Sequence, residues 1–293
     1  MPPFRPTVAP KNLHIAPGAR SSTNAPDNTA EPHAADPLPH VTLPRGGGAI
    51  HGLGEKFSVS AATGTSKLTL PLALSPARSG FTPGLELDYD SGSRNGPFGF
   101  GWKLSLPSIT RKTDKGLPQY RDADESDVFI PAGAEDLVPV LDANGARVHA
   151  ARKVCGIDYD VHPYRPRIEG LFSRIERWVN VTTGISHWRT ISTSNVTTLY
   201  GYDNLSSVFD PASPSHIFSW MICRTWDDNG NAASYAYVAD DGQGVLRSQA
   251  NEMNRTEAVR ATQRYVSVVS YGNTQPYFPV WSETGPETPF PSE

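Results

Sequence analysis

The stretch from Leu68 to Leu106 constrains the fold of this chain more than any other feature, because it alternates apolar and polar residues in three runs. The apolar positions are Leu68, Leu70, Leu72 and Leu74, then Leu85, Leu87 and Tyr89, then Phe100, Trp102, Leu104 and Leu106. Successive side chains of a strand point to opposite faces, so a period of two places these residues on one face. Gly, Pro, Ser and Asn separate the runs, and the pattern therefore predicts a β-meander with one buried face.

The rest of the chain also favours short strands joined by turns. Glycine (25) and proline (27) are abundant, and no long window has apolar residues at helical spacing. Asp142–Gly145 ends in Asn-Gly, which fits the positive φ angles of a type I′ turn, and Asp227–Asn231 is a second turn between strands. Only Gln249–Gln263 reads as a helix or a long polar loop. We expect an all-β, mainly antiparallel fold with meander and hairpins in one or two layers, like a shell or sandwich.

Composition divides the chain into three segments. Residues 1–45 are rich in Pro, Ala, Ser and Asn and hold too few apolar side chains to offset the entropy of ordering, so they are predicted to be disordered. Residues 46–273 form the predicted β-rich domain. Residues 274–293 are Pro-rich and read as a tail, and we expect the chain to be cut short there.

Charge and hydropathy argue against two classes of partner. The formal net charge is −4 with a pI near 6.1, and no cluster of Lys and Arg occurs. Binding of nucleic acid needs a concentrated basic patch, so no nucleic-acid partner is predicted. No apolar run approaches the roughly 20 residues of a membrane-spanning helix, so no membrane span is predicted either.

Two polar motifs resemble metal sites without matching one. Asp122, Asp124 and Asp127 lie close together in RDADESD, but the Gly and the terminal Glu of a calcium-binding loop are missing. A solvated acidic turn explains them better. The second motif consists of Asp227, Asp228, Asn229 and Asn231. These residue types are common metal ligands, but they are also the ones that a hairpin turn favours, and the turn explains them. No metal site is therefore predicted.

The remaining candidates for chemistry also have structural explanations. His187 precedes a tryptophan in a predicted strand, which favours packing over a role as a catalytic base. Gly46–Gly54 is glycine-rich, but no Gly-Lys-Ser/Thr follows, so it is interpreted as flexible backbone entering a sheet and not as a phosphate-binding loop. Cys155 and Cys223 are expected to be buried free thiols, and a single disulfide between them is the alternative. We predict no catalytic, cofactor-binding or metal-binding residue, no cofactor and no enzymatic activity.

Four tryptophans on predicted strands leave one alternative function open. A secreted module that binds carbohydrate or protein would use exposed aromatic rings as stacking platforms. The candidates are Trp178, Trp188, Trp220 and Trp226. Packing in the core is the competing interpretation of all four.

Many separate motifs resemble one family. The run from GGGAIHGLGEKFSVSAATGTSKLTLPLAL to GFGWKLSLPSITRKTDKGLPQY resembles the start of the SpvB-like family, which includes the Salmonella virulence plasmid 65 kDa B protein and the B components of insecticidal toxin complexes. The resemblance continues through SDVFIPAGAEDLVPVL, YRPRIEGLFSRIERW, IFSWMICRTWDDNGNAASYAYV and RYVSVVSYGN, and so covers residues 46–273. The WDDNGN hairpin also resembles one unit of the Tyr-Asp (YD/Rhs-like) repeats of these toxins.

The resemblance implies a structural role. In toxin-complex B components this region opens a β-rich protein that forms a hollow shell with a C component, and the enclosed toxin leaves through the channel of the A component. In the plasmid virulence protein a similar region precedes an actin ADP-ribosyltransferase, whose motifs this chain lacks. We expect a non-catalytic assembly module whose partners are a C-type shell component, an A-type channel or further toxin domains. We also expect export without a classical signal peptide, with a cytoplasmic pool before release.

Overall fold

The structure, a computed structural model, describes residues 56–59, 64–170 and 172–291. The predicted disordered leader, residues 1–45, and the loop Gly46–Gly54 lie outside the described residues. Every strand pairing among the described residues is antiparallel, which confirms the predicted all-β class. The α-helix α1 (Glu257–Arg260) has four residues, and no helix in the described ranges has the length and apolar character of a membrane span.

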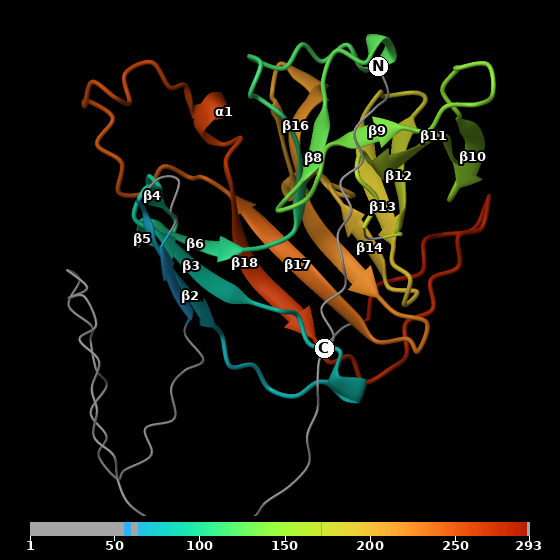
Figure 1. Cartoon of the computed structure of the whole chain (residues 1–293), viewed down its shortest axis with the longest axis horizontal. Helices are drawn as coiled ribbons and strands as arrows, with labels where there is room; N and C mark the ends of the chain where they lie inside the picture. Colours follow the sequence, from blue (N-terminus) through green and yellow to red (C-terminus); the bar gives the residue numbers. More distant parts are fainter. Residues whose placement is uncertain (1–55, 60–63, 171, 292–293) are drawn as a thin grey trace, which may run out of the picture. The chain divides into compact units, whose positions relative to one another are not determined.

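Eight strands close into a barrel (Figure 1). In order around it they are β14 (Thr197–Tyr200), β13 (Ser186–Ile191), β12 (Arg174–Asn180), β11 (Ile157–Pro166), β9 (Leu137–Pro139), β8 (Phe129–Pro131), β7 (Ser108–Arg111) and β16 (Ser213–Trp226). The ring closes because β16 pairs with β7 through residues 219–221 and with β14 through residues 222–226. The sequence predicted the strands of this region, but its closure into a barrel is a finding of the structure.

Aromatic side chains fill the barrel interior. The buried cluster takes residues from seven of the eight strands: Ile109, Phe129, Leu137, Tyr164, Ile175, Trp188, Ile217 and Trp220. The Phe129 ring lies between two tryptophans, with centroid distances of 5.0 Å to Trp188 and 5.6 Å to Trp220. Since side chains fill the interior of an eight-stranded barrel of this kind, it forms a packed core.

The predicted meander forms a separate four-stranded sheet. Its strands are β1 (Lys56–Val59), β2 (Ser66–Pro71), β3 (Glu86–Asp90) and β6 (Trp102–Ser105), in that order. The small hairpin β4 (Asn95–Gly96) and β5 (Gly99–Phe100) precedes β6. The alternation and the antiparallel pairing are confirmed. The face expected to be buried is only half-buried among the described residues, because the main core lies in the barrel.

Among the described residues, four further strands belong to the same sheet outside the ring of eight. β17 (Ala232–Ala239) pairs with β16, and β18 (Arg264–Tyr271) pairs with β17. β10 (Ala150–Val154) pairs with β11, and β15 (Ser207–Asp210) pairs with β16. Three short 3₁₀ turns connect strands: η1 (Arg78–Gly80), η2 (Asp122–Asp124) and η3 (Asn204–Ser206).

The two predicted hairpin turns form, and they share one geometry. The Asp142 carboxylate accepts from the backbone N–H groups of residues 144 and 146, and the Asp227 carboxylate accepts from those of residues 229 and 231. The glycines have positive φ, 81° at Gly145 and 79° at Gly230, but the preceding asparagines do not. The type I′ prediction at Asp142–Gly145 was therefore wrong, since that turn needs positive φ at both central residues.

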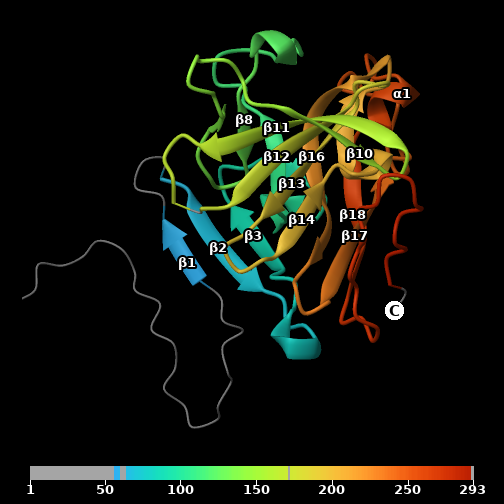
Figure 2. The ribbon, with the colours of Figure 1, turned by 90° about the vertical axis from the view of Figure 1, so that its right-hand side faces the viewer.

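The segment after Asn273 is packed on the barrel and is not a free tail (Figure 2). Tyr277 is buried in a cluster with Trp226, at a ring centroid distance of 5.7 Å. Trp281 also stacks on Trp226, at a centroid distance of 6.4 Å with an interplanar angle of 25°. The prolines of this segment stop regular strands, but the aromatic side chains between them pack it against the barrel.

Candidate interaction surface

The free edge of β18 is the first feature that points to a partner. β18 ends the order of the barrel sheet, and its backbone pairs with β17 on one side only within the described residues. An edge strand presents unpaired N–H and C=O groups, which other chains can use for pairing unless the edge is covered. The predicted last strand therefore lies where it can accept another strand.

The second feature is an uncharged apolar face on the meander sheet. Cross-strand pairing aligns Leu68, Tyr89 and Trp102 in one row, and Leu70, Leu87 and Leu104 in the next. Of these six residues none belongs to the four buried clusters found in the described part of the chain. Two neighbouring rings are more exposed still, 69% for Phe57 and 64% for Phe100. A contiguous apolar face of this kind marks an interaction surface.

The opposite face of the same sheet is polar and internally bonded. The Asp88 carboxylate accepts from the Thr69 hydroxyl at 2.6 Å and from the Ser105 hydroxyl. Although burial opposes ionisation, these hydrogen bonds hold the pKa of Asp88 below its usual range. A partner protein that excludes water would therefore bind to the apolar face, because burial of apolar surface is favourable.

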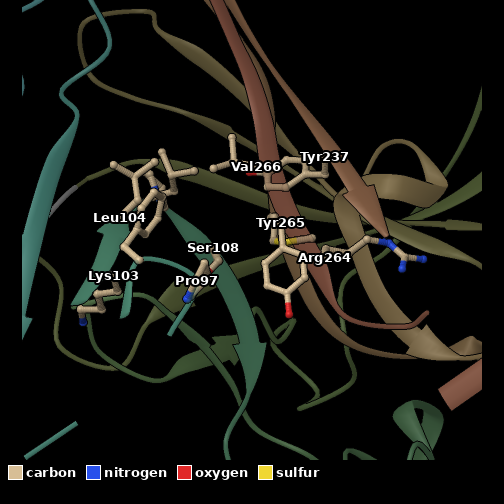
Figure 3. A pocket seen from close by; sticks show the side chains of 12 residues that line it. Pro97, Lys103, Leu104, Ser108, Tyr237, Arg264, Tyr265 and Val266 are labelled. Atoms are coloured by element: carbon tan, nitrogen blue, oxygen red, sulfur yellow. The ribbon is translucent and has the colours of Figure 1, made fainter. Parts of the chain in front are cut away.

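An apolar groove joins this sheet to β18. Its volume is about 230 Å³, and β6 lines one side and β18 the other, while Met221 and Tyr237 contribute from β16 and β17. Figure 3 shows Leu104 on one side and Val266, Tyr237 and Tyr265 on the other. The full lining is Pro97, Phe98, Lys103, Leu104, Leu106, Pro107, Ser108, Met221, Tyr237, Arg264, Tyr265 and Val266.

Two cations and no acidic residue line the groove. The guanidinium of Arg264 has no carboxylate within 4 Å in the described ranges; it bonds to the carbonyl oxygens of Ala261 and Gln263, and its Nε has no partner. Burial lowers the pKa of Arg264, as expected for a cation held away from water without a counter-ion. Figure 3 shows Arg264 and Lys103 on opposite walls of the groove, with their charged groups directed away from each other.

The sequence did not single out Arg264, Tyr265 or Lys103. The apolar positions of the meander predicted one wall of the groove, through Leu104. The other wall arises from a contact between strands about 160 residues apart in the chain, which no local pattern reports.

The acidic motif at Asp122, Asp124 and Asp127 closes one end of the barrel instead of facing solvent as a whole. Asp122 binds Arg111, whose Nη2 lies 2.9 Å from its carboxylate, and also Arg177. Asp127 binds Arg111 at 2.8 Å. The guanidinium groups hold the pKa of Asp122 at about 2 although burial opposes ionisation. Only Asp124 is solvated as predicted, with 72% of its side chain exposed.

A polar cavity of about 350 Å³ lies beside this ion-pair cluster. It is lined in part by Arg147, Asp160, His162 and Arg177. The charges are matched within the protein, since Arg147 pairs with Glu125, and Asp160 pairs with both His162 and the neighbouring His149. Within the described ranges, no group of three or more His, Cys, Asp or Glu side chains is placed to hold a metal ion.

His187 lies in an aromatic stack on the outside of the barrel, as the packing interpretation predicted. Its ring is 5.9 Å from Trp178 and 5.0 Å from Tyr202. Burial lowers the pKa of His187 to about 3, and the charge of Arg189 adds to this effect. The side chain is therefore buried and neutral at physiological pH.

The four tryptophans proposed as sugar platforms are buried. Their exposed fractions are 3% for Trp178, 0% for Trp188 and Trp220, and 8% for Trp226. None therefore offers an open ring face for stacking on a glycan. This removes the residues on which the carbohydrate-binding alternative rested.

Both cysteines are free thiols, as predicted. Cys223 is buried, and its Sγ donates to the carbonyl of Leu199. Burial raises the pKa of Cys223 to about 11, so its thiol stays protonated and unreactive at neutral pH.

Comparison with known proteins identifies the fold just described. The family described as Salmonella virulence plasmid 65kDa B protein matches residues 60–289. The chain belongs to this SpvB family. The match begins between β1 and β2 of the meander sheet and extends through the barrel into the packed C-terminal segment, so the predicted resemblance is confirmed and reaches beyond Asn273.

The relatives found by sequence are mono(ADP-ribosyl)transferases named SpvB. The mono(ADP-ribosyl)transferase SpvB of Salmonella typhimurium is 35% identical over 241 residues, which are 80% of this chain and 38% of that protein. The same protein from Salmonella dublin matches equally, at 35% identity over 241 residues with the same coverage. The chain thus spans less than two-fifths of the length of these curated relatives.

Solved structures place the similarity in the N-terminal part of SpvB and in toxin complexes. The N-terminal domain of the effector SpvB from Salmonella typhimurium strain LT2 superposes with a TM-score of 0.63 at 37% identity, covering 71% of this chain and 64% of that one. TcdB2-TccC3 gives a TM-score of 0.65 at 33% identity over 80% of this chain and 11% of that one. A Photorhabdus luminescens Tc holotoxin pore gives 0.66 at 32% identity, with coverages of 80% and 10%.

Proposed function

We propose that this chain is a non-catalytic structural module that helps to build the shell which carries or encloses a toxic effector. The observation that carries the proposal is a pair of surfaces that the described residues cover only in part, the free edge of β18 and the half-buried, uncharged apolar face of the meander sheet. Both are stabilised by contact with another protein surface. The similarity to chains that are much longer, or that lie in toxin complexes, supports this role.

The proposed partners follow from the relatives. TcdB2-TccC3 and the holotoxin pore are structures of toxin complexes, which supports a C-type shell component and an A-type channel as partners. Further domains of a longer toxin protein are the other source of a covering surface. The proposal also includes action outside the producing cell after export without a classical signal peptide, which fractionation of culture supernatant and cytoplasm tests.

The absence of catalysis is part of the proposal. The matched solved domain of SpvB is its N-terminal domain, and the buried polar groups described above are engaged in ion pairs or aromatic packing. Incubation with NAD and actin should leave actin unmodified. Transfer of ADP-ribose by this chain would contradict the proposal.

Co-expression tests the assembly role. The chain is produced with the protein encoded beside it, captured by an affinity tag and passed over a size-exclusion column with light-scattering detection. The proposal expects a stable complex of defined mass. A monomer that never co-elutes with its neighbour, although both proteins are folded, would contradict it.

A further inference from the structure

The groove in Figure 3 runs between two free strand edges. β6 ends the four-stranded sheet and β18 ends the barrel sheet. Neighbouring residues of a strand point to opposite faces, yet Arg264, Tyr265 and Val266 all line the groove, as do Lys103 and Leu104. A groove that meets consecutive residues on both sides lies along the strand edges and not on one face of either sheet.

The size of the groove selects its class of occupant. Pockets for small-molecule ligands usually measure about 300 to 1,000 Å³. The volume here is about 230 Å³, and the walls are apolar side chains with no catalytic or metal-binding group among them. A few side chains of an extended polypeptide fit this space better than a cofactor does. The free backbone groups of β18 add main-chain pairing, which is how sheets capture extended segments.

The charges on the two walls define the sequence of the occupant. Arg264 has no carboxylate partner in the described part of the chain. Lys103 lies opposite Asp88 in the pairing of β3 with β6 and helps to lower the pKa of Asp88, but no ion pair within 4 Å joins the two in the described residues. The lining holds two cations, Lys103 and Arg264, and no anion. Carboxylates on the occupant would therefore form ion pairs with the cation on each wall. Basic segments would be repelled, which gives the groove selectivity.

We propose that this groove binds an extended segment of a partner polypeptide, which pairs with the β18 edge. Apolar side chains of the segment lie between Leu104 and Val266, and Asp or Glu residues on both flanks pair with Lys103 and Arg264. The inference rests on the proposed assembly role and names the chemistry of the surface that the partner presents. Such a strand would join the meander sheet to the barrel sheet.

A random-peptide phage library is the probe. Panning against the intact chain should enrich peptides with an apolar centre and acidic residues on both flanks. In fluorescence anisotropy, a synthetic peptide of this kind should bind Lys103→Glu/Arg264→Glu at least about tenfold more weakly, and the peptide with Lys in place of the acidic residues should regain binding. N-methylation of alternate backbone amides should abolish binding, since pairing with β18 needs those donors.

A matched control separates the groove from net charge. Arg78→Glu/Lys115→Glu makes the same charge change at two exposed positions outside the groove and should bind like the parent chain. If Arg264→Glu unfolds the domain, Lys103→Glu alone should still weaken binding by several-fold. Selected peptides without acidic flanks, or equal affinity for the parent and the groove variant, would overturn the proposal.

Co-elution with the protein encoded beside this chain tests the assembly role and the groove as docking site separately. Loss of the complex with the groove variant, but not with the control variant, supports both. A complex that forms equally with the groove variant overturns the groove as the docking site and leaves the assembly role standing. Failure of the parent chain to co-elute contradicts the assembly role, while the peptide experiment still decides the chemistry of the groove.

Discussion

The ion-pair cluster at the end of the barrel allows the sharpest prediction about stability. Replacing Asp122 by Asn keeps the shape of the side chain but removes its charge. Arg177, whose side chain is 5% exposed, then has no carboxylate partner, and Arg111 keeps only Asp127. Loss of one partner leaves a buried charge uncompensated, and this is the costly part of breaking such a pair.

The magnitude follows from the pKa of Asp122. The pKa is lowered from 3.8 to about 2, and one pKa unit corresponds to about 1.4 kcal/mol, so ionised Asp122 contributes roughly 2 kcal/mol to folding. We expect Asp122→Asn to lower the free energy of unfolding by about 2 to 4 kcal/mol at neutral pH. The folded pKa lies below the unfolded one, so this contribution is present above pH 3.8 and is lost as pH falls toward about 2.

Urea unfolding followed by tryptophan fluorescence measures the effect, at about pH 7 and again at about pH 3. Asp124→Asn is the matched control, because Asp124 lies two residues away with 72% of its side chain exposed. It should change the free energy of unfolding by less than about 0.5 kcal/mol. Equal effects of the two substitutions, or a difference that does not shrink at low pH, would refute the reasoning.

Three further predictions concern the barrel and its outer face. His187→Phe should reduce the fall of the melting temperature between about pH 6.5 and pH 5. Burial holds the pKa of His187 at about 3, so in this pH range only the unfolded chain takes up a proton at this residue. An unchanged pH dependence of the melting temperature in differential scanning fluorimetry would count against this. Trp188→Ala should lower the free energy of unfolding by about 3 to 5 kcal/mol and Trp102→Ala by much less, because only Trp188 is fully buried; equal losses in urea titrations would place the core elsewhere. Ending the chain after Asn273 should raise acrylamide quenching of tryptophan fluorescence by uncovering Trp226, and unaltered quenching would mean that the C-terminal segment does not cover the barrel in solution.

Local patterns predicted much of the fold correctly. The meander strands alternate with a period of two, and their Leu, Tyr and Trp residues lie on one face. They lie where expected, at β2, β3 and β6. The strands of the barrel were harder to assign to a face. In β12, buried Ile175 and Arg177 point inward, and Glu176 lies between them on the other face and is buried as well. Where charged residues are buried on both faces, alternation no longer separates inside from outside.

Long-range contacts explain what the sequence did not predict. The arginine partners of Asp122 come from β7 and β12, and its pairing with Arg177 joins residues 55 positions apart. The groove needs β6 and β18 together, and the C-terminal segment is held by aromatic rings between prolines. None of these contacts has a periodicity in the chain, whereas a hairpin turn is specified by a few adjacent residues.

Amide hydrogen exchange at β18 tests the assembly role most directly. In the isolated chain, the outward-facing N–H groups of Arg264–Tyr271 should exchange much faster than those of β17, which pairs on both sides. In the complex with the neighbouring protein, the same β18 amides should become protected. Full protection of β18 in the isolated chain, or no gain of protection in the complex, would contradict the account.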